Sequence, residues 1–74
     1  METRKIWMRL GAYVFGTAEE IDKVINGDVE TLKNLLDKKQ IEFSGDTYIT
    51  EECIEDYNEE FGTDHEPTVV EFDL

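Results

Sequence analysis

The 74-residue sequence predicts a single small α+β domain in which helices pack against a small sheet, in the order β-α-α-β-β-α-β. Apolar residues alternate in some segments and recur at helical spacing in others, and capping residues or glycines separate these segments. A chain of 8.6 kDa with 39% apolar residues can build one modest core. No repeat or low-complexity linker divides residues 1–74 into further domains.

Residues 4–15 alternate well enough to form one long strand. Its wholly apolar face, the better candidate for the core, consists of Ile6, Met8, Leu10, Ala12 and Val14. Its opposite face consists of Trp7, Arg9, Gly11, Tyr13 and Phe15. A glycine within a strand suggests a bulge or a close approach of another backbone. We therefore expect the first face to be buried and the second to be half covered.

Two helices are expected next, each preceded by a capping residue. Thr17 and Glu20 have the spacing of a capping box, which predicts a helix over 18–26. Asp28 is the expected cap of a second helix over about 29–39. The residues expected to face the core are Ile21, Val24, Ile25, Val29, Leu32, Leu35 and Leu36.

The second half of the chain predicts three more strands and one more helix. Short strands are expected over 41–43 and 47–49, a helix over 51–61 and a final strand over 68–72. The turn between the first two strands is Ser44-Gly45-Asp46, and the helix is bounded by Thr50 and Gly62. Its apolar positions are Cys53, Ile54, Tyr57 and Phe61.

Charge is the most informative feature of the sequence. The chain has 19 acidic and 7 basic residues and a net charge of −12. All seven Lys and Arg lie in residues 1–40, where seven acids balance them, whereas residues 41–74 hold twelve acids and no Lys or Arg. This composition argues against direct binding to DNA, RNA or an anionic membrane, because each of these requires a basic surface.

The densest acidic segment is the helix expected over 51–61. One row at i, i+4 spacing is Glu51, Glu55 and Glu59, and the other is Glu52, Asp56 and Glu60. Six charges over ~13.5 Å of helix give one per ~2.3 Å, compared with one per ~1.7 Å along duplex DNA. The acids that would extend this surface are Glu42, Asp46, Asp64, Glu66, Glu71 and Asp73. We interpret the surface as a binding site for a basic protein; the alternative is a solvated face that serves solubility.

In size, charge and α+β build, the chain resembles the small acidic inhibitors of CRISPR and restriction nucleases that phages and mobile elements encode. The resemblance covers the whole chain loosely and includes no sequence motif. It implies that the carboxylates imitate a nucleic-acid backbone and occupy the basic groove of a nuclease.

Enzymatic activity is not expected from this sequence. His65 lies in a polar loop, and Cys53 lies on the apolar stripe of its helix, where a buried thiol is typical. The helix carboxylates form a charged face without an evident pocket, which general acid–base catalysis would need. No cofactor is expected; the alternative is a zinc ion held by Cys53, His65 and nearby carboxylates such as Asp56 or Asp64.

A second kind of interface is possible on the aromatic face of the first strand. If that face is open, Trp7, Tyr13 and Phe15 form an apolar patch next to Arg9 that suits a protein partner or a second copy of the chain. The longest apolar run, over 12–15, is far shorter than the ~20 residues that span a bilayer. This short run and the single cysteine lead us to expect a cytoplasmic, reducing location.

Overall fold

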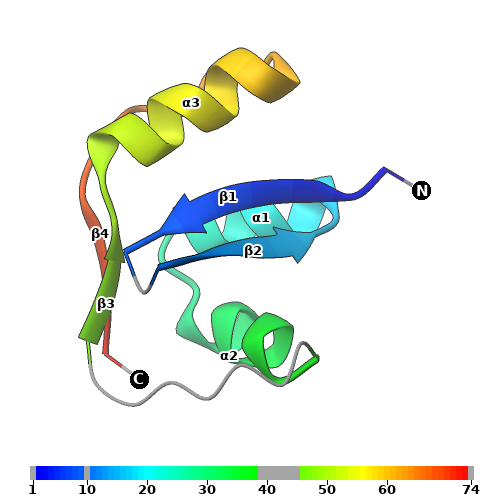
Figure 1. Ribbon diagram of the computed structural model, residues 1–74, viewed down its shortest axis with the longest axis vertical. Helices are drawn as coiled ribbons and strands as arrows, with labels where there is room; N and C mark the ends of the chain where they lie inside the picture. Colours follow the sequence, from blue (N-terminus) through cyan, green and yellow to red (C-terminus); the bar gives the residue numbers. More distant parts are fainter. Residues whose placement is uncertain (1, 10, 39–45, 74) are drawn as a thin grey trace.

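The computed structural model describes residues 2–9, 11–38 and 46–73 (Figure 1). Its elements are β1 (Arg4–Met8), β2 (Ala12–Gly16), α1 (Ala18–Ile25), α2 (Val29–Lys38), β3 (Asp46–Ile49), α3 (Glu51–Phe61) and β4 (Val70–Asp73). The α+β class is confirmed, and the predicted order holds with a hairpin in the place of the first strand. The strand predicted over 41–43 lies outside the described residues, as do Ser44 and Gly45 of the turn predicted after it, whereas Asp46, predicted as a turn residue, begins β3. The described strands form two antiparallel two-stranded sheets, β1–β2 and β3–β4, instead of the single small sheet expected.

The single long strand predicted over 4–15 is wrong, because the chain reverses direction after Met8. β1 pairs antiparallel with β2, and Met8 lies opposite Ala12. Gly11 adopts a positive φ of 88°, and its N–H donates a hydrogen bond of 3.0 Å to the carbonyl of Met8. The loop between the paired residues has three members, and this odd number keeps the alternation of faces in step across the turn. For the described residues the two predicted faces are therefore correct even though the strand is not, and Leu10 lies outside the described residues.

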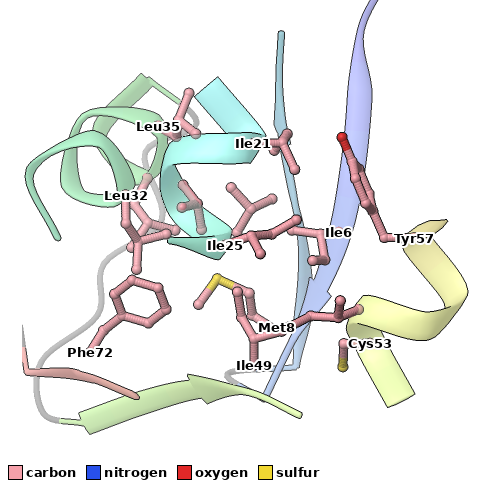
Figure 2. Packing of buried hydrophobic residues seen from close by; sticks show 14 residues of the cluster. Ile6, Met8, Ile21, Ile25, Leu32, Leu35, Ile49, Cys53, Tyr57 and Phe72 are labelled. Atoms are coloured by element: carbon pink, nitrogen blue, oxygen red, sulfur yellow. The ribbon is translucent and has the colours of Figure 1, made fainter. Parts of the chain in front are cut away.

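The apolar face of the hairpin forms the centre of the core. Ile6, Met8 and Val14 are each at most 2% exposed. Every other element adds buried side chains to this cluster, among them Ile21, Leu32, Ile49, Tyr57 and Phe72 (Figure 2). The core stripes predicted for the two helices of the first half are confirmed, except that Val29 is only partly buried.

The helices surround the hairpin on three sides. α1 lies behind it, α3 runs along β1, and α2 lies beside β2 (Figure 1). The β3–β4 ribbon crosses the turn end of the hairpin, where the N–H of Arg9 donates to the carbonyl of Tyr48 at 3.0 Å. α2 and α3 lie at opposite ends of the molecule, on the β2 side and the β1 side of the hairpin (Figure 1).

The predicted helix caps are confirmed. Thr17 Oγ1 accepts a hydrogen bond of 3.2 Å from the Glu20 N–H, and Glu20 Oε1 accepts one of 2.9 Å from the Thr17 N–H. The bond from the Thr17 N–H is the largest cause that lowers the pKa of the Glu20 carboxyl. Asp28 accepts a bond from the amide three residues further on, and Thr50 Oγ1 accepts one of 3.4 Å from the Cys53 N–H.

Two threonines near the β3–α3 junction predict opposite effects of the same substitution. The Thr47 hydroxyl is buried and has no hydrogen-bond partner in the described part of the chain, so Thr47→Val should raise the free energy of unfolding by up to about 1 kcal/mol. Thr50→Val should lower it by about 1 kcal/mol, because it removes the α3 cap. Urea denaturation followed by circular dichroism measures both. A Thr47→Val variant as unstable as Thr50→Val would contradict this assignment.

The capping box predicts a specific pH dependence. Because hydrogen bonds from Thr17 lower the pKa of Glu20 in the folded state, this carboxylate stabilises the fold above its unfolded pKa, and the contribution disappears as the pH falls through the folded pKa. Glu20→Gln keeps a hydrogen-bond acceptor but carries no charge. The difference in unfolding free energy between wild type and Glu20→Gln should therefore shrink as the pH falls below about 4.3, the ordinary pKa of a glutamate side chain. A difference that stays constant below this pH would show that the charge of Glu20 contributes nothing.

Candidate acidic interface on α3

The candidate site is the solvent-facing surface of α3, which we call the acidic face. The opposite side of the helix is buried and consists of Cys53, Ile54 and Tyr57. The six predicted carboxylates are all exposed, in the rows Glu51, Glu55, Glu59 and Glu52, Asp56, Glu60. Since the apolar stripe packs on the core, the packing itself turns the carboxylates toward solvent.

Among the described residues, one basic side chain of the first half of the chain forms an ion pair with a carboxylate of α3. Lys5 Nζ lies 4.0 Å from Glu60 Oε1. The described lysines of α2 lie at the other end of the molecule, and one of them, Lys38, pairs with Glu20 at 3.7 Å (Figure 1). The carboxylates of α3 are thus gathered at one end and are not neutralised by the lysines of α2.

The acidic face costs the helix stability. Its four like-charged i, i+4 pairs each cost ~0.2–0.5 kcal/mol, or roughly 1–2 kcal/mol together. Glu51 and Glu52 interact favourably with the positive end of the helix dipole, but Glu59 and Glu60 oppose its negative end, and the last turn contains no basic residue. Helix stability alone does not account for this arrangement.

The loop after α3 extends the acidic face, and Asn58 holds this loop in place. The Asn58 amide donates to the His65 carbonyl at 2.8 Å, while its oxygen accepts from the His65 N–H at 3.0 Å and from the Thr63 hydroxyl at 2.7 Å. Asp64 and Glu66 flank His65 and are exposed. The acidic surface therefore continues beyond the C-terminal end of the helix.

Of the other four acids expected to extend this surface, the structure describes the side chains of two. Glu71 and Asp73 are exposed on β4, in the ribbon below the N-terminal end of α3 (Figure 1). Glu42 and the side chain of Asp46 lie outside the described residues. The acidic face is therefore centred on α3 and its following loop.

His65 and Cys53, the two central residues of the zinc alternative, each have another partner. His65 Nε2 lies 2.9 Å from Asp22 Oδ1 on α1, and Cys53 Sγ lies 3.1 Å from Thr50 Oγ1. Cys53 is buried, as expected. Within residues 2–9, 11–38 and 46–73, no group of three or more His, Cys, Asp or Glu side chains is placed to hold a metal ion.

The alternative interface forms an aromatic patch on the outer face of the hairpin. Trp7, Tyr13 and Phe15 are 39%, 44% and 40% exposed. Trp7 and Tyr13 pack edge to face, with ring centroids 4.9 Å apart and planes at 75°, and Tyr13 and Phe15 lie 6.3 Å apart. Arg9 is exposed at the turn of the same hairpin. The structure thus brings together the aromatic side chains that the sequence placed on one face.

Two residues that position these surfaces escaped the sequence analysis. Lys5 lies between Glu60 and the ring of Tyr13, 4.8 Å from its centroid. Lys5, Trp7 and Tyr13 all have odd residue numbers. Because side chains alternate between the two faces of a strand, this spacing could have placed Lys5 on the aromatic face. Asn58 interrupts the acids in the middle of a helix, where Asn is unfavourable unless it makes local hydrogen bonds.

A hollow of about 450 Å³ between α1 and α2 is lined by Glu20, Lys23, Thr31, Asn34 and Lys38. The carboxylate of Glu20 is already engaged by the capping box and by Lys38. The carboxylate in the described lining of this hollow is therefore already paired.

No family model matches the chain, and neither a curated protein nor a solved structure matches it. None of the described helices is both long and apolar enough to span a bilayer. The acidic face and the aromatic patch are therefore the observations from which a function can be argued.

The like charges of α3 predict that neutralising them stabilises the protein. In a variant with Gln or Asn at all six positions of the two rows, the unfolding free energy at low salt should rise by roughly 1–2 kcal/mol, because the repulsive pairs are removed. Added salt should raise the stability of the wild type more than that of the variant. As a control, Glu51→Gln/Glu52→Gln alone should not stabilise, since these acids favour the helix dipole. A sixfold variant less stable than wild type would refute the repulsion.

Proposed function

We propose that this protein is a non-enzymatic binding protein whose acidic face occupies a basic, nucleic-acid-binding surface of a partner protein. The observation that supports the proposal is a set of six exposed carboxylates in two rows on one helix, with one cation contact among the described residues. Their density along the helix is comparable to that of phosphates along duplex DNA. The partner class that fits best is a CRISPR or restriction nuclease, which the protein would inhibit by competing with DNA.

Long-range attraction would speed the association. A strongly acidic chain and a basic groove attract each other before contact, so that association is fast and weakens with salt. The lysines of α2 lie at the far end from the acidic face and would not be desolvated by such a partner (Figure 1). The stability that α3 gives up to like-charge repulsion would be recovered when cations of the partner approach it.

A second candidate function is a protein–protein interaction module that binds through the aromatic patch, with the acids serving solubility. Trp7, Tyr13 and Phe15, each about two-fifths exposed, favour this alternative. Its complexes would depend little on salt, and Trp7→Ala or Tyr13→Ala would weaken them. A titration of complex formation against ionic strength therefore separates the two candidates.

The proposal predicts competition with DNA that depends on where the charge lies. Fluorescent duplex DNA is bound, without Mg²⁺, to a restriction endonuclease or to a guide-loaded CRISPR nuclease, and its displacement by the protein is followed by anisotropy. Wild type should displace the duplex at low salt, and Glu55→Gln/Asp56→Asn/Glu59→Gln should do so at least tenfold more weakly.

The matched control removes the same charge elsewhere. Glu19→Gln/Glu30→Gln/Asp37→Asn neutralises three exposed acids of α1 and α2 and should retain at least a third of the wild-type potency. Equal losses in the two triple variants would mean that only net charge matters, and displacement that survives the α3 substitutions would eliminate the mimic proposal.

A further inference from the structure

We infer that the acidic face and the Trp7–Tyr13 pair of the aromatic patch form one continuous surface that imitates single-stranded nucleic acid. The carboxylates take the place of phosphates, and the exposed rings take the place of unstacked bases. This inference rests on the proposed function and narrows the partner to proteins whose groove binds a single strand.

The two surfaces adjoin because α3 runs along β1 (Figure 1). Lys5 connects them: its Nζ lies 4.0 Å from Glu60 Oε1 and 4.8 Å from the ring centroid of Tyr13. On the inner side, Arg4 Nη1 donates to the Tyr57 hydroxyl at 3.3 Å, and its guanidinium lies 5.3 Å from the ring centroid of Phe61. These contacts hold the helix and the strand in one relative position, so anions and rings are presented together.

The rings are held in place but remain accessible. Trp7 and Tyr13 lie opposite each other in the β1–β2 register and pack edge to face at 4.9 Å. They are nevertheless 39% and 44% exposed. Their neighbours on the inner face, Ile6 and Met8, are buried and fix the backbone of the strand. A pair of rings that is fixed in position and partly exposed can enter a stacking site at little entropic cost.

The combination of anions and rings distinguishes two kinds of groove. Proteins that hold single strands combine a basic channel with aromatic side chains on which successive bases stack. Proteins that read duplexes contact phosphates and the edges of paired bases, whose faces are stacked inside the helix. A row of carboxylates beside exposed rings therefore matches the first kind of groove better than the second.

Charge decides between a protein and a nucleic acid as the occupant of this surface. The aromatic patch with Lys5 and Arg9 resembles a stacking platform for bases, but Glu60 already pairs with Lys5. The adjacent rows of carboxylates and a net charge of −12 would repel phosphates. The occupant that complements the whole surface is a basic protein groove that contains stacking side chains.

The inference is tested with a bacterial single-stranded-DNA-binding protein of the OB-fold type, loaded with fluorescent oligothymidylate, next to the duplex-loaded endonuclease used above. Wild type should displace the oligothymidylate at low salt. Trp7→Ala/Tyr13→Ala should be at least tenfold weaker in this assay, and Trp7→Phe/Tyr13→Phe should retain most of the effect. Tyr48→Ala is the matched control, because Tyr48 is 42% exposed but makes no ring contact with Trp7 or Tyr13 in the described part of the chain.

Each result leads to a definite conclusion. If wild type displaces the duplex but not the single strand, the inference is overturned and the proposed function stays intact. The same conclusion follows if Trp7→Ala/Tyr13→Ala displaces the single strand as well as wild type does. Failure to displace either nucleic acid overturns both. If thermal denaturation shows that the double variant is unfolded, Tyr13→Thr, which keeps a residue suited to a strand, carries the same expectation of weaker displacement.

Discussion

The packing of α3 along β1 is the contact on which the rest of the structure depends. Ile54 and Tyr57 are almost completely buried there, and Arg4 reaches from the strand to the Tyr57 hydroxyl. Once this side of the helix is buried, the polar positions of α3 can only face solvent. The acidic face is therefore a geometric consequence of how one apolar stripe is buried. The same contact places the helix next to the outer face of the hairpin.

Two kinds of local interaction extend this constraint to the surroundings. The Asn58 amide binds the following loop through His65 and Thr63, and this loop presents its own carboxylates beyond the end of the helix. Lys5 joins the helix to the aromatic patch. These contacts lie outside the core. They hold the loop and the aromatic patch in fixed positions relative to the acidic face. A domain of this size has a small free energy of unfolding, so the like charges on α3 lower it without a benefit to folding. We therefore explain these charges by binding to a partner.

The hairpin illustrates how a correct pattern can accompany a wrong element. Alternation over 4–15 is equally compatible with one long strand and with two strands joined by an odd-numbered loop, because both keep the same residues on the same face. Gly11 was the signal for the turn: with a φ of 88°, it occupies the left-handed region that a hairpin of this kind requires. The buried and exposed sides were predictable, whereas the pairing of Trp7 with Tyr13 was not.

The sequence by itself determined the α+β class, the three helices with their caps, the residues of the core stripes and the two acidic rows, because each depends on local spacing or on hydrogen bonds within a few residues. The tertiary structure alone decided that the described strands form two separate ribbons, that α2 and α3 lie at opposite ends, and that Lys5 links the acidic face to the aromatic patch. It also gave His65 and Cys53 the partners Asp22 and Thr50. Such relations join residues that are distant in the chain, and they follow from how the apolar faces are buried together, which local periodicity does not encode.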